Sequence, residues 1–397
     1  MQNDTYAKWR RRIHRRKFLI LIGFSMVGAM GLLFSQFSLT RKTKDFLKSV
    51  LHSLKPIYDL PEEGKYTSIE TALNSRCNSD YEGNPEKYHW GIFDTTKKLS
   101  SEQIKALISL AKIPRFTDQK VEIQSKRNIL TFVIQNQVSG ILRDWMMVES
   151  GMQQQSVGLV CAALGVGMAF RNLGKDGTSI SDTDYGTIKI RLDPMKPSYN
   201  GSFWSNLPPA GRNPWLKGNL PHPVRDGGKR LLATLDNLGT HNKSSKKSTE
   251  QSISQLLWAA RGRTPHLYNS KPWGMTIPTW AGKQDISRVY LISNNRSSTY
   301  VNWDNNRPTH ALSELKEIDK KLFHKSMKSF SENNGFIILG RNEDFARALW
   351  EVGYQLLNLV LQASVLNIDY RAFLLDKDQK VIFEDIGIKA PVAILAF

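Results

Sequence analysis

Residues 149–167 read ESGMQQQSVGLVCAALGVG, and residues 351–369 read EVGYQLLNLVLQASVLNID. Both stretches open with the pattern Glu-x-Gly-x-Gln and continue as an apolar, helix-like segment. Their leucines also match, for example Leu159 with Leu361, and one interval of 202 residues separates every matched pair. The repeating units of solenoid proteins are roughly 20 to 50 residues long, far shorter than this interval. A repeat this long therefore predicts one domain that occurs twice in the chain.

Helix and strand patterns recur in the same order in the two halves of the chain. The first half has helix patterns at 68–83 and 97–113, with Ser68 and Ser100 or Ser101 as capping residues, and a strand pattern at 128–136. The second half has helix patterns at 231–241 and 248–262 and strand patterns at 287–293, 335–340 and 390–397. The helices are recognised by apolar residues spaced three and four apart and by their caps.

A stretch rich in Gly, Pro and Asn at residues 194–223 separates the two halves. We therefore predict an α+β fold with a first domain at 66–215 and a second at 216–397. The two repeated helices are apolar on most faces, as expected of helices buried between two copies. A structure in which these helices do not touch would contradict this prediction.

The first 65 residues predict an anchor and a linker. Residues 18–37 carry no charge, and a helix of that length spans about 30 Å, one hydrocarbon thickness. The preceding residues 14–19 (HRRKFL) resemble the twin-arginine export signal, although basic residues also flank ordinary anchor helices. We expect an uncleaved, membrane-anchoring helix within residues 1–40, a linker at 41–65, and the rest of the chain outside the cytoplasm.

The formal net charge of +19 is partly local, because the anchor and linker are strongly basic. No helix-turn-helix, zinc-finger spacing or RNA-binding aromatic motif occurs in the remainder, so nucleic acid is not the expected partner. Two cysteines, Cys77 and Cys161, exclude a disulfide framework and a Cys-ligated zinc site. The eight histidines have no ligand spacing and are expected at the surface or in turns, with no metal site.

Several segments resemble the nitroreductase-like flavoprotein superfamily, and within it the SagB/ThcOx-type dehydrogenases. They are the segments LPHPVRDGG (220–228), SQLLWAARG (254–262), IPTWAG (277–282) and the helix at 351–369. The first half shows a weaker version of the same pattern. The resemblance implies a homodimer-like arrangement with FMN at the interface between copies. In a tandem repeat this arrangement would be a pseudo-dimer within one monomeric chain.

The family's phosphate-binding segment follows the first helix and is rich in arginine, whose guanidinium matches phosphate oxygens. In the first copy Ser75 and Arg76 stand at its opening positions, but residues 77–80 (CNSD) follow where more arginine is expected. In the second copy residues 236–242 (DNLGTHN) contain no arginine. His241 falls near the last arginine position.

Two further family elements have been retained in different copies. The segment Pro-Ser-x-Gly, which faces the flavin ring, has a counterpart in residues 278–282 (PTWAG) of the second copy only. The segment Leu-Gly-x-Gly allows close backbone approach to the ring. It occurs at residues 164–167 of the first copy, whereas the second copy has LNID at 366–369. The resemblance thus implies one composite FMN site, formed by Ser75, Arg76, Asn78, Gly165, Gly167, Thr279 and Gly282.

Two functions remain open at this stage. The first is an FMN-dependent oxidoreductase that passes electrons between a reduced donor and a small organic acceptor. In such enzymes the flavin carries the chemistry, so no catalytic acid or base is nominated. The alternative is a flavin-free pseudoenzyme that serves as an interaction or assembly protein. Complementary loss of motifs favours the first function, and the missing arginines favour the second.

Overall fold

We describe a computed structural model of the chain. The structure describes residues 68–75, 78–79, 98–134, 138–164, 166–171, 188–194, 216, 218–224, 228–264, 274–278, 286–305, 307–313, 316–318, 335–342 and 346–397. All of them belong to one compact unit, Leu60–Phe397. The predicted anchor and linker at residues 1–65 lie outside the described residues. Within the described part of the chain, no helix combines the length and the apolar character needed to cross a bilayer.

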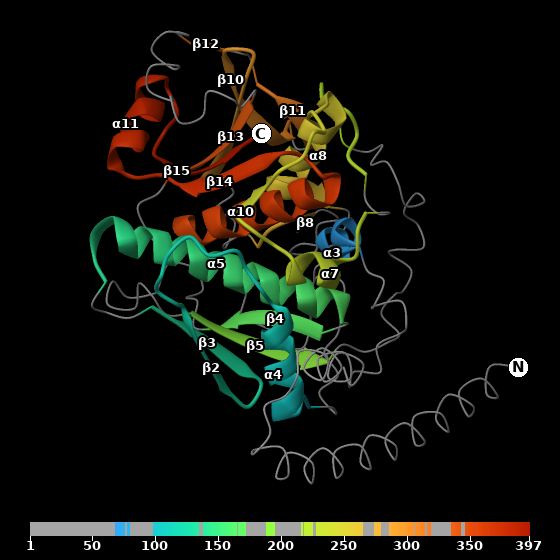
Figure 1. Ribbon diagram of the computed structural model, residues 1–397. Coiled ribbons are helices and arrows are strands. Elements are labelled where there is room, and N and C mark those ends of the chain that lie inside the picture. The colour runs from blue at the N-terminus through green and yellow to red at the C-terminus, as the bar shows by residue number, and fades with distance from the viewer. Residues whose placement is uncertain are drawn as a thin grey trace, which may run out of the picture. The chain divides into compact units, whose positions relative to one another are not determined.

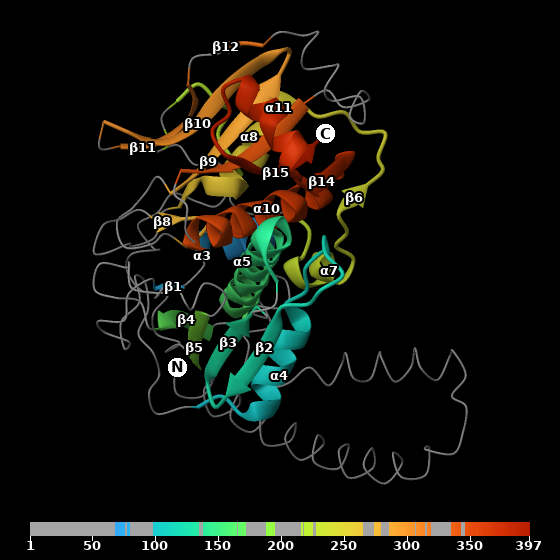
Figure 2. The ribbon, with the colours of Figure 1, turned by 90° about the vertical axis from the view of Figure 1, so that its left-hand side faces the viewer.

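Two long helices form the centre of this unit and pack against each other. They are α5 (Gly140–Ala163) and α10 (Ala346–Leu366), and they contain the two repeated stretches. Figure 1 shows them side by side, with one sheet beyond α5 and another beyond α10, and Figure 2 shows the same layers from the side. The predicted contact between the repeated helices is therefore confirmed. Both helices begin well before the repeated Glu, at Gly140 and Ala346.

The closest approach of the two helices is reciprocal. A Cβ atom at Gly151 would lie 2.7 Å from Cα of Trp350, and a Cβ atom at Gly353 would lie 2.8 Å from the backbone N of Met152 and closer still to Val148 O. The interval of 202 residues separates Gly151 from Gly353 and Val148 from Trp350. Each helix thus places a glycine against the backbone of the other helix at the equivalent position. A residue with a side chain would not leave room for the opposing backbone.

The sheet beyond α5 has five strands in the order β1-β4-β5-β3-β2. They are β1 (Asn78–Ser79), β2 (Glu122–Lys126), β3 (Ile129–Val133), β4 (Val166–Arg171) and β5 (Ile188–Pro194). Leu130, Phe132, Ile188, Ile190 and Leu192 are buried in this sheet, while Ile129, Thr131 and Lys189 alternate with them and are more exposed. This period of two is typical of a sheet with one buried face.

The sheet beyond α10 has eight strands, in the order β11-β10-β9-β13-β15-β14-β6, with β12 on β10. They are β6 (His241–Asn242), β9 (Ser287–Ser293), β10 (Arg296–Asp304), β11 (Arg307–Leu312), β12 (Lys316–Glu317), β13 (Gly335–Arg341), β14 (Tyr370–Leu374) and β15 (Pro391–Ala396). A separate pair consists of β7 (Arg263–Thr264) and β8 (Gly274–Met275). Strands β9, β13 and β15 match the predicted strands.

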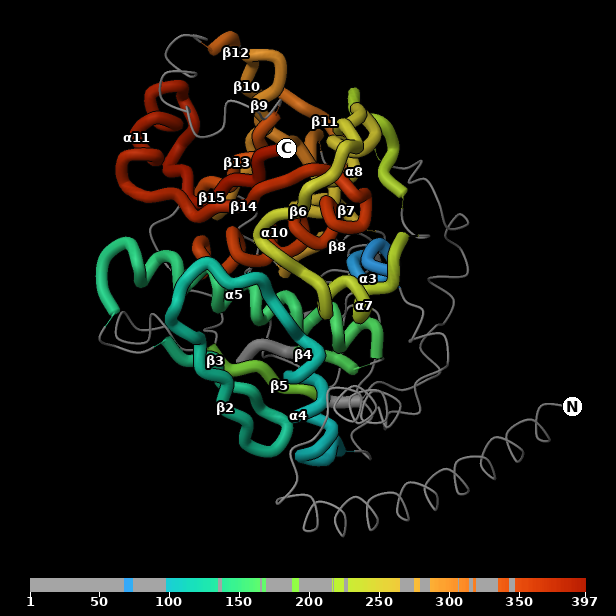
Figure 3. Tube along the Cα trace, in the orientation of Figure 1, coloured from blue at the N-terminus to red at the C-terminus, as the bar shows by residue number. Residues whose placement is uncertain are grey.

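Part of the larger sheet has the same strand order as the smaller one. The order β6-β14-β15-β13-β9 parallels β1-β4-β5-β3-β2, and all pairs after the first are antiparallel in both sheets. Asn78 pairs with Met168, and Asn242 pairs with Tyr370, which lies 202 residues after Met168. The first pairs differ in direction, since β1–β4 is parallel and β6–β14 is antiparallel. Figure 3 traces each central helix into the strand that follows it.

In the described part of the chain, shorter helices flank the layers: α3 (Ile69–Ser75), α4 (Ser101–Leu110), α7 (Leu231–Asp236), α8 (Glu250–Arg261) and α11 (Lys377–Asp385). Ser100 caps α4 in a capping box with Gln103, and Ser68 accepts from the backbone of Thr71 at the start of α3. Both predicted caps are thereby confirmed. Helix α11 covers the outer face of the larger sheet, where Phe383 packs with Ile338 and Ile394.

The glycine contact yields a first prediction. Gly151→Ala and Gly353→Ala each place a methyl group against the backbone of the opposite helix, and we expect each to lower the free energy of unfolding by about 1–3 kcal/mol. Because the contacts are reciprocal, the two losses should be similar. Chemical denaturation measures them, and Lys105→Ala on the exposed side of α4 is the control. Unchanged stability in either glycine variant would show that the helices do not meet here.

Candidate functional site

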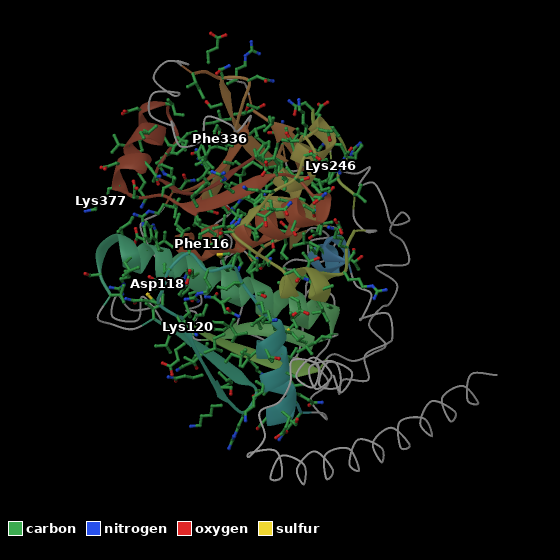
Figure 4. The ribbon with its side chains drawn as sticks, in the orientation of Figure 1. Phe116, Asp118, Lys120, Lys246, Phe336 and Lys377 are labelled. Atoms are coloured by element: carbon green, nitrogen blue, oxygen red, sulfur yellow. The ribbon has the colours of Figure 1, made fainter. Side chains whose placement is uncertain are left out.

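The first glutamate of each repeated stretch is fully buried and held in place. Glu149 Oε1 accepts from the backbone N–H groups of Phe116 at 2.6 Å and Thr117 at 2.8 Å, and its Oε2 accepts from the Thr117 hydroxyl at 3.1 Å. Arg115 forms an ion pair with Glu149 at 3.3 Å. Burial raises the pKa of the Glu149 carboxyl, and the hydrogen bonds from Phe116 and Thr117 and the charge of Arg115 oppose that shift. Figure 4 labels Phe116 in the segment beside α5.

Glu351 occupies the equivalent position on α10. Its carboxylate accepts from the Arg261 guanidinium at 2.8 Å and from the Ser287 hydroxyl at 2.7 Å. Arg261 ends α8 and also donates to Ser287 Oγ at 2.6 Å. Arg115 follows α4 in the same way, so each glutamate binds the arginine that lies at or after the end of the second helix of its own half. Both pairs fix a central helix to its neighbours, and neither glutamate is exposed to a reactant.

A polar junction joins α5, α10 and Thr276, which lies two residues before the segment 278–282 that the sequence predicted to face the flavin. Gln155 Nε2 donates to Asn358 Oδ1 at 2.8 Å and to Thr276 O at 3.1 Å. Asn358 Nδ2 donates to Thr276 O at 3.2 Å and to Ala259 O at 2.9 Å. Both amide side chains and Thr276 are fully buried. The backbone at Thr276 is therefore fixed by one residue from each half of the chain.

A second residue of α10 bonds the start of β9. Gln355 Nε2 donates to Ser287 Oγ at 2.9 Å, and Ser287 follows the segment at the start of β9. Gln355 Oε1 is buried and accepts no hydrogen bond from any residue that the structure describes. A buried amide oxygen of this kind is a ready acceptor for an N–H donor.

The structure brings some of the predicted site residues together. Ser75 ends α3, Asn78 lies on β1 and Gly167 lies on β4. Strand β1 pairs with β4, and the partner of Asn78 is Met168, next to Gly167. The predicted phosphate-binding segment and the predicted glycine segment are therefore neighbours on one sheet. The other four predicted residues, Arg76, Gly165, Thr279 and Gly282, lie outside the described residues.

The equivalent region of the second half is closed by its own side chains. Tyr370 Oη donates to Gly239 O at 3.0 Å, and Asn242 Nδ2 donates to Ile368 O at 2.9 Å. Lys246, labelled in Figure 4, donates to Leu366 O at 3.0 Å at the end of α10. Asn367 follows with a φ of 54°, where the first half has Gly165. These contacts occupy the backbone at the end of α10 and at the start of β14.

His310 is a buried residue that sequence reasoning placed wrongly, since it was expected at the surface or in a turn. It lies on β11, with Nε2 2.7 Å from Ser254 Oγ and Nδ1 2.7 Å from Tyr300 Oη. The Ser254 hydroxyl donates to Pro221 O. Ser254 therefore accepts from His310 Nε2–H, and Nδ1 accepts from Tyr300. A serine that gives its proton to a carbonyl is not an activated nucleophile, so this chain of hydrogen bonds is structural.

Burial, followed by the nearby His222, lowers the pKa of His310 to about 3. The segment at 307–312 carries Arg, Pro and Thr and was not recognised as a strand, and its two buried residues, Thr309 and His310, are adjacent, so no alternating pattern signals the burial. Among the described residues, no cluster of three or more His, Cys, Asp or Glu side chains could hold a metal ion.

Neither a family model nor a curated relative matches the chain. Three solved structures, each provisionally described as a nitroreductase, share a distant likeness. The one from Ralstonia eutropha is 20% identical, with 48% of this chain and 92% of that chain covered and a TM-score of 0.32. The one from Anabaena variabilis is 11% identical, with 64% of each chain covered and a TM-score of 0.40. The one from Thermotoga maritima is 9% identical, with 83% and 94% covered and a TM-score of 0.35.

The two arginine pairs predict unequal losses of stability. Arg261→Met leaves the Glu351 charge buried with the Ser287 hydroxyl as its described neutral donor, and we expect a loss of about 3–5 kcal/mol. Arg115→Met should cost about 1 kcal/mol or less, because Arg115 is 36% exposed and Glu149 keeps its donors from Phe116 and Thr117. Denaturant titrations of both variants decide this. Equal losses of stability in the two variants would contradict the difference in burial between the two ion pairs.

The low pKa of His310 predicts a loss of stability in acid. The unfolded chain takes up a proton near pH 6.5, whereas folded His310 does so only near pH 3. Stability should therefore fall as pH drops through this window, by up to about 1.4 kcal/mol per pH unit. His310→Gln removes the titration, so its unfolding midpoint should depend less on pH between 6.5 and 4. Glu149, with its raised pKa, acts in the opposite direction in both proteins and cancels in the comparison. Parallel pH profiles would contradict the burial of neutral His310.

Proposed function

We propose that the chain is an FMN-dependent oxidoreductase of the nitroreductase-like superfamily, built from two copies of one domain at 66–215 and 216–397. The shared strand order of the two sheets and the reciprocal glycine contact support the duplication. An interval of 202 residues relates both partners of that contact. In this proposal α5 and α10 are the interface helices of a pseudo-dimer, so the chain acts as a monomer. The nearest branch by its motifs is the SagB/ThcOx-type dehydrogenases.

The pseudo-dimer holds one composite flavin site. Arg76 holds the phosphate, with Ser75 and Asn78 as further hydrogen-bond donors. Gly165 and Gly167 allow the backbone to approach the ring, and Thr279 with Gly282 contact it from the second copy. The single observation that carries this proposal is the junction at Thr276. There Thr276 O, two residues before Pro278, accepts from one residue of α5 and one residue of α10.

The described contacts support one site rather than two. In the first copy, β1 lies beside β4 and places Asn78 next to the Gly167 strand. In the second copy, Tyr370, Asn242 and Lys246 occupy the corresponding backbone. Residues 236–242 also contain no arginine, so the second copy has no guanidinium at the position that corresponds to Arg76. The second region therefore lacks the charge that the phosphate of FMN requires.

When bound, FMN would supply the electron-transfer chemistry between a reduced donor and a small organic acceptor. The residues of the chain bind and orient it and exclude water from the helix interface. We further propose that residues 1–40 anchor the protein in a membrane with its body on the extracytoplasmic side, based on the apolar run and the twin-arginine-like residues 14–19. Protease accessibility of the body in intact cells separates this placement from a cytoplasmic one.

A second candidate function is a flavin-free protein that keeps the fold for interaction or assembly. The closed region of the second copy favours it, as does the replacement of arginine by Cys77, Asn78, Ser79 and Asp80 in the first copy. Under this alternative the buried polar junctions serve stability alone.

The colour of the purified protein distinguishes the two functions. The flavin proposal predicts a yellow protein with one FMN per chain after reconstitution. Arg76→Ala should weaken FMN binding roughly ten- to a hundredfold, because a charge-assisted contact is lost, while thermal unfolding stays unchanged. His241→Ala is the matched control in the second copy and should bind FMN like the parent protein. A colourless protein that takes up no FMN, or full FMN occupancy in Arg76→Ala, would favour the second candidate.

A further inference from the structure

Two lysines from different segments reach the C-terminal end of α10. Lys229 Nζ donates to Ser364 O at 3.4 Å. Lys246 Nζ donates to Leu366 O at 3.0 Å, at the last residue of the helix. The carbonyl groups at a helix C-terminus carry partial negative charge and attract such cations. Both lysines are nevertheless exposed, so they cap the helix and still contribute positive charge to the surface.

Further cations extend this surface along the edge of the eight-stranded sheet. His241 on β6 pairs with Arg371 on β14, so their side chains lie on the same face of the sheet, at its edge strand. Lys243 and Lys247 lie in the connection between β6 and α8, on either side of Lys246. The basic rim is the exposed set formed by Lys229, Arg230, Lys243, Lys246, Lys247 and Arg371.

Nearby acidic side chains do not neutralise the basic rim. In residues 228–249 and 367–371, which contain the whole rim, the acidic residues are Asp236 and Asp369. Asp236 already pairs with Lys112 of the first half of the chain at 2.9 Å. The rim therefore has a local excess of positive charge, and such a surface attracts anionic partners.

The composition of the rim favours a lipid surface over nucleic acid. Residues 228–249 contain no Phe, Tyr or Trp, and Tyr370 beside Arg371 is buried. Proteins bind single-stranded nucleic acid by stacking its bases on aromatic side chains, and the rim offers none. Clusters of about four to eight lysines and arginines are instead typical of surfaces that bind anionic lipids. Half-buried apolar residues, Val365 and Leu366, lie beside the lysines at the end of α10.

The rim also lies where the N-terminal part of the chain joins the body. Ser68, the first residue that the structure describes, forms an isolated antiparallel bridge with Arg230 of the rim. Residues 1–67, which include the proposed anchor, therefore connect to the body at the rim. A tether at this point raises the effective concentration of the rim at the surface that holds the anchor.

We propose that the basic rim is a docking surface for anionic phospholipid headgroups, so that the body lies against the membrane with the C-terminal end of α10 facing the bilayer. The proposal takes the anchor at residues 1–40 from the proposed function and adds a second contact that does not depend on flavin. Exposed charges attract one another weakly, and salt screens the attraction. Several charges together with an anchor hold the body in one orientation.

Acetylation of lysines in the full-length protein, held in phospholipid nanodiscs, tests this proposal. Discs of phosphatidylcholine alone are compared with discs that also contain phosphatidylglycerol, and mass spectrometry gives the acetylation rate at each lysine. Lys243 and Lys247 report on the rim, because their side chains make no hydrogen bond or ion pair in the described part of the chain. Lys120 and Lys377 are exposed controls, and Figure 4 shows both well away from Lys246.

We expect acetylation of Lys243 and Lys247 to be about fivefold slower in the anionic discs, and high salt should remove this difference. Acetylation of Lys120 and Lys377 should change little. The double variant Lys243→Glu/Arg371→Glu should lose the protection of Lys247. The matched control Lys120→Glu/Lys377→Glu, which changes the net charge equally, should keep it. All four substituted residues are exposed, so both variants should unfold like the parent protein.

Equal slowing at all lysines, or no slowing at Lys243 and Lys247, would overturn the docking surface. Protection of these two lysines in neutral discs by an added DNA duplex, as strong as that in anionic discs, would overturn lipid as the partner. A protein that does not co-elute with neutral discs would contradict the anchor at residues 1–40. Protection in the anionic discs would still decide whether the rim binds lipid.

Discussion

The close approach of α5 and α10 is the constraint on which the rest of the structure depends. Gly151 meets the backbone at Trp350, and Gly353 meets the backbone at Val148, so two backbones touch where side chains usually separate helices. Away from this contact, α5 packs against β4 and β3 of the five-stranded sheet. Helix α10 packs against β15 and β13 of the eight-stranded sheet and also against α8. The two halves of the chain can therefore bury their central helices only against each other. This mutual burial explains why residues 60–397 form one compact unit.

Close packing also decides where the polar side chains of these helices go. On α10, Glu351, Gln355, Asn358 and Gln362 recur at helical spacing and are all fully buried. They reach outward to Arg261, Ser287, Thr276 and Glu70, and so fix loops and neighbouring helices to the central pair. Such a buried polar stripe contributes less to stability than an apolar one would.

Much of the fold was predictable from local patterns. The repeated Glu-x-Gly-x-Gln stretches identified the central helices, and Ser100 with Gln103 identified the start of α4, because these signals lie within a few neighbouring residues. The first nine residues of α5 were missed, since Gly140 begins that helix with a left-handed φ of 61° rather than a recognisable cap. Strands β10 and β11 and helix α11 were also missed. Their residues are largely polar, and tertiary contacts stabilise them more than their own propensity does.

The site was predictable in outline only. Motif order placed Asn78 and Gly167 in one region, and β1 does lie beside β4. The junction of Gln155, Asn358 and Thr276 was not predictable, because its residues lie 82 to 203 positions apart in the chain. No local pattern indicates a buried amide that bonds a distant carbonyl. The same holds for His310, whose burial depends on Ser254 and Tyr300 from a helix and a neighbouring strand.

The central claim is that α5 and α10 form one cooperative unit whose two halves stabilise each other. Native-state hydrogen exchange of the full-length protein at increasing denaturant tests it most directly. The account predicts that the slowest amides of both helices, around Gly151 and around Gly353, exchange with the same free energy and that this value equals the free energy of global unfolding. Amides of α5 that exchange at a distinctly lower free energy, while those of α10 stay protected, would contradict it.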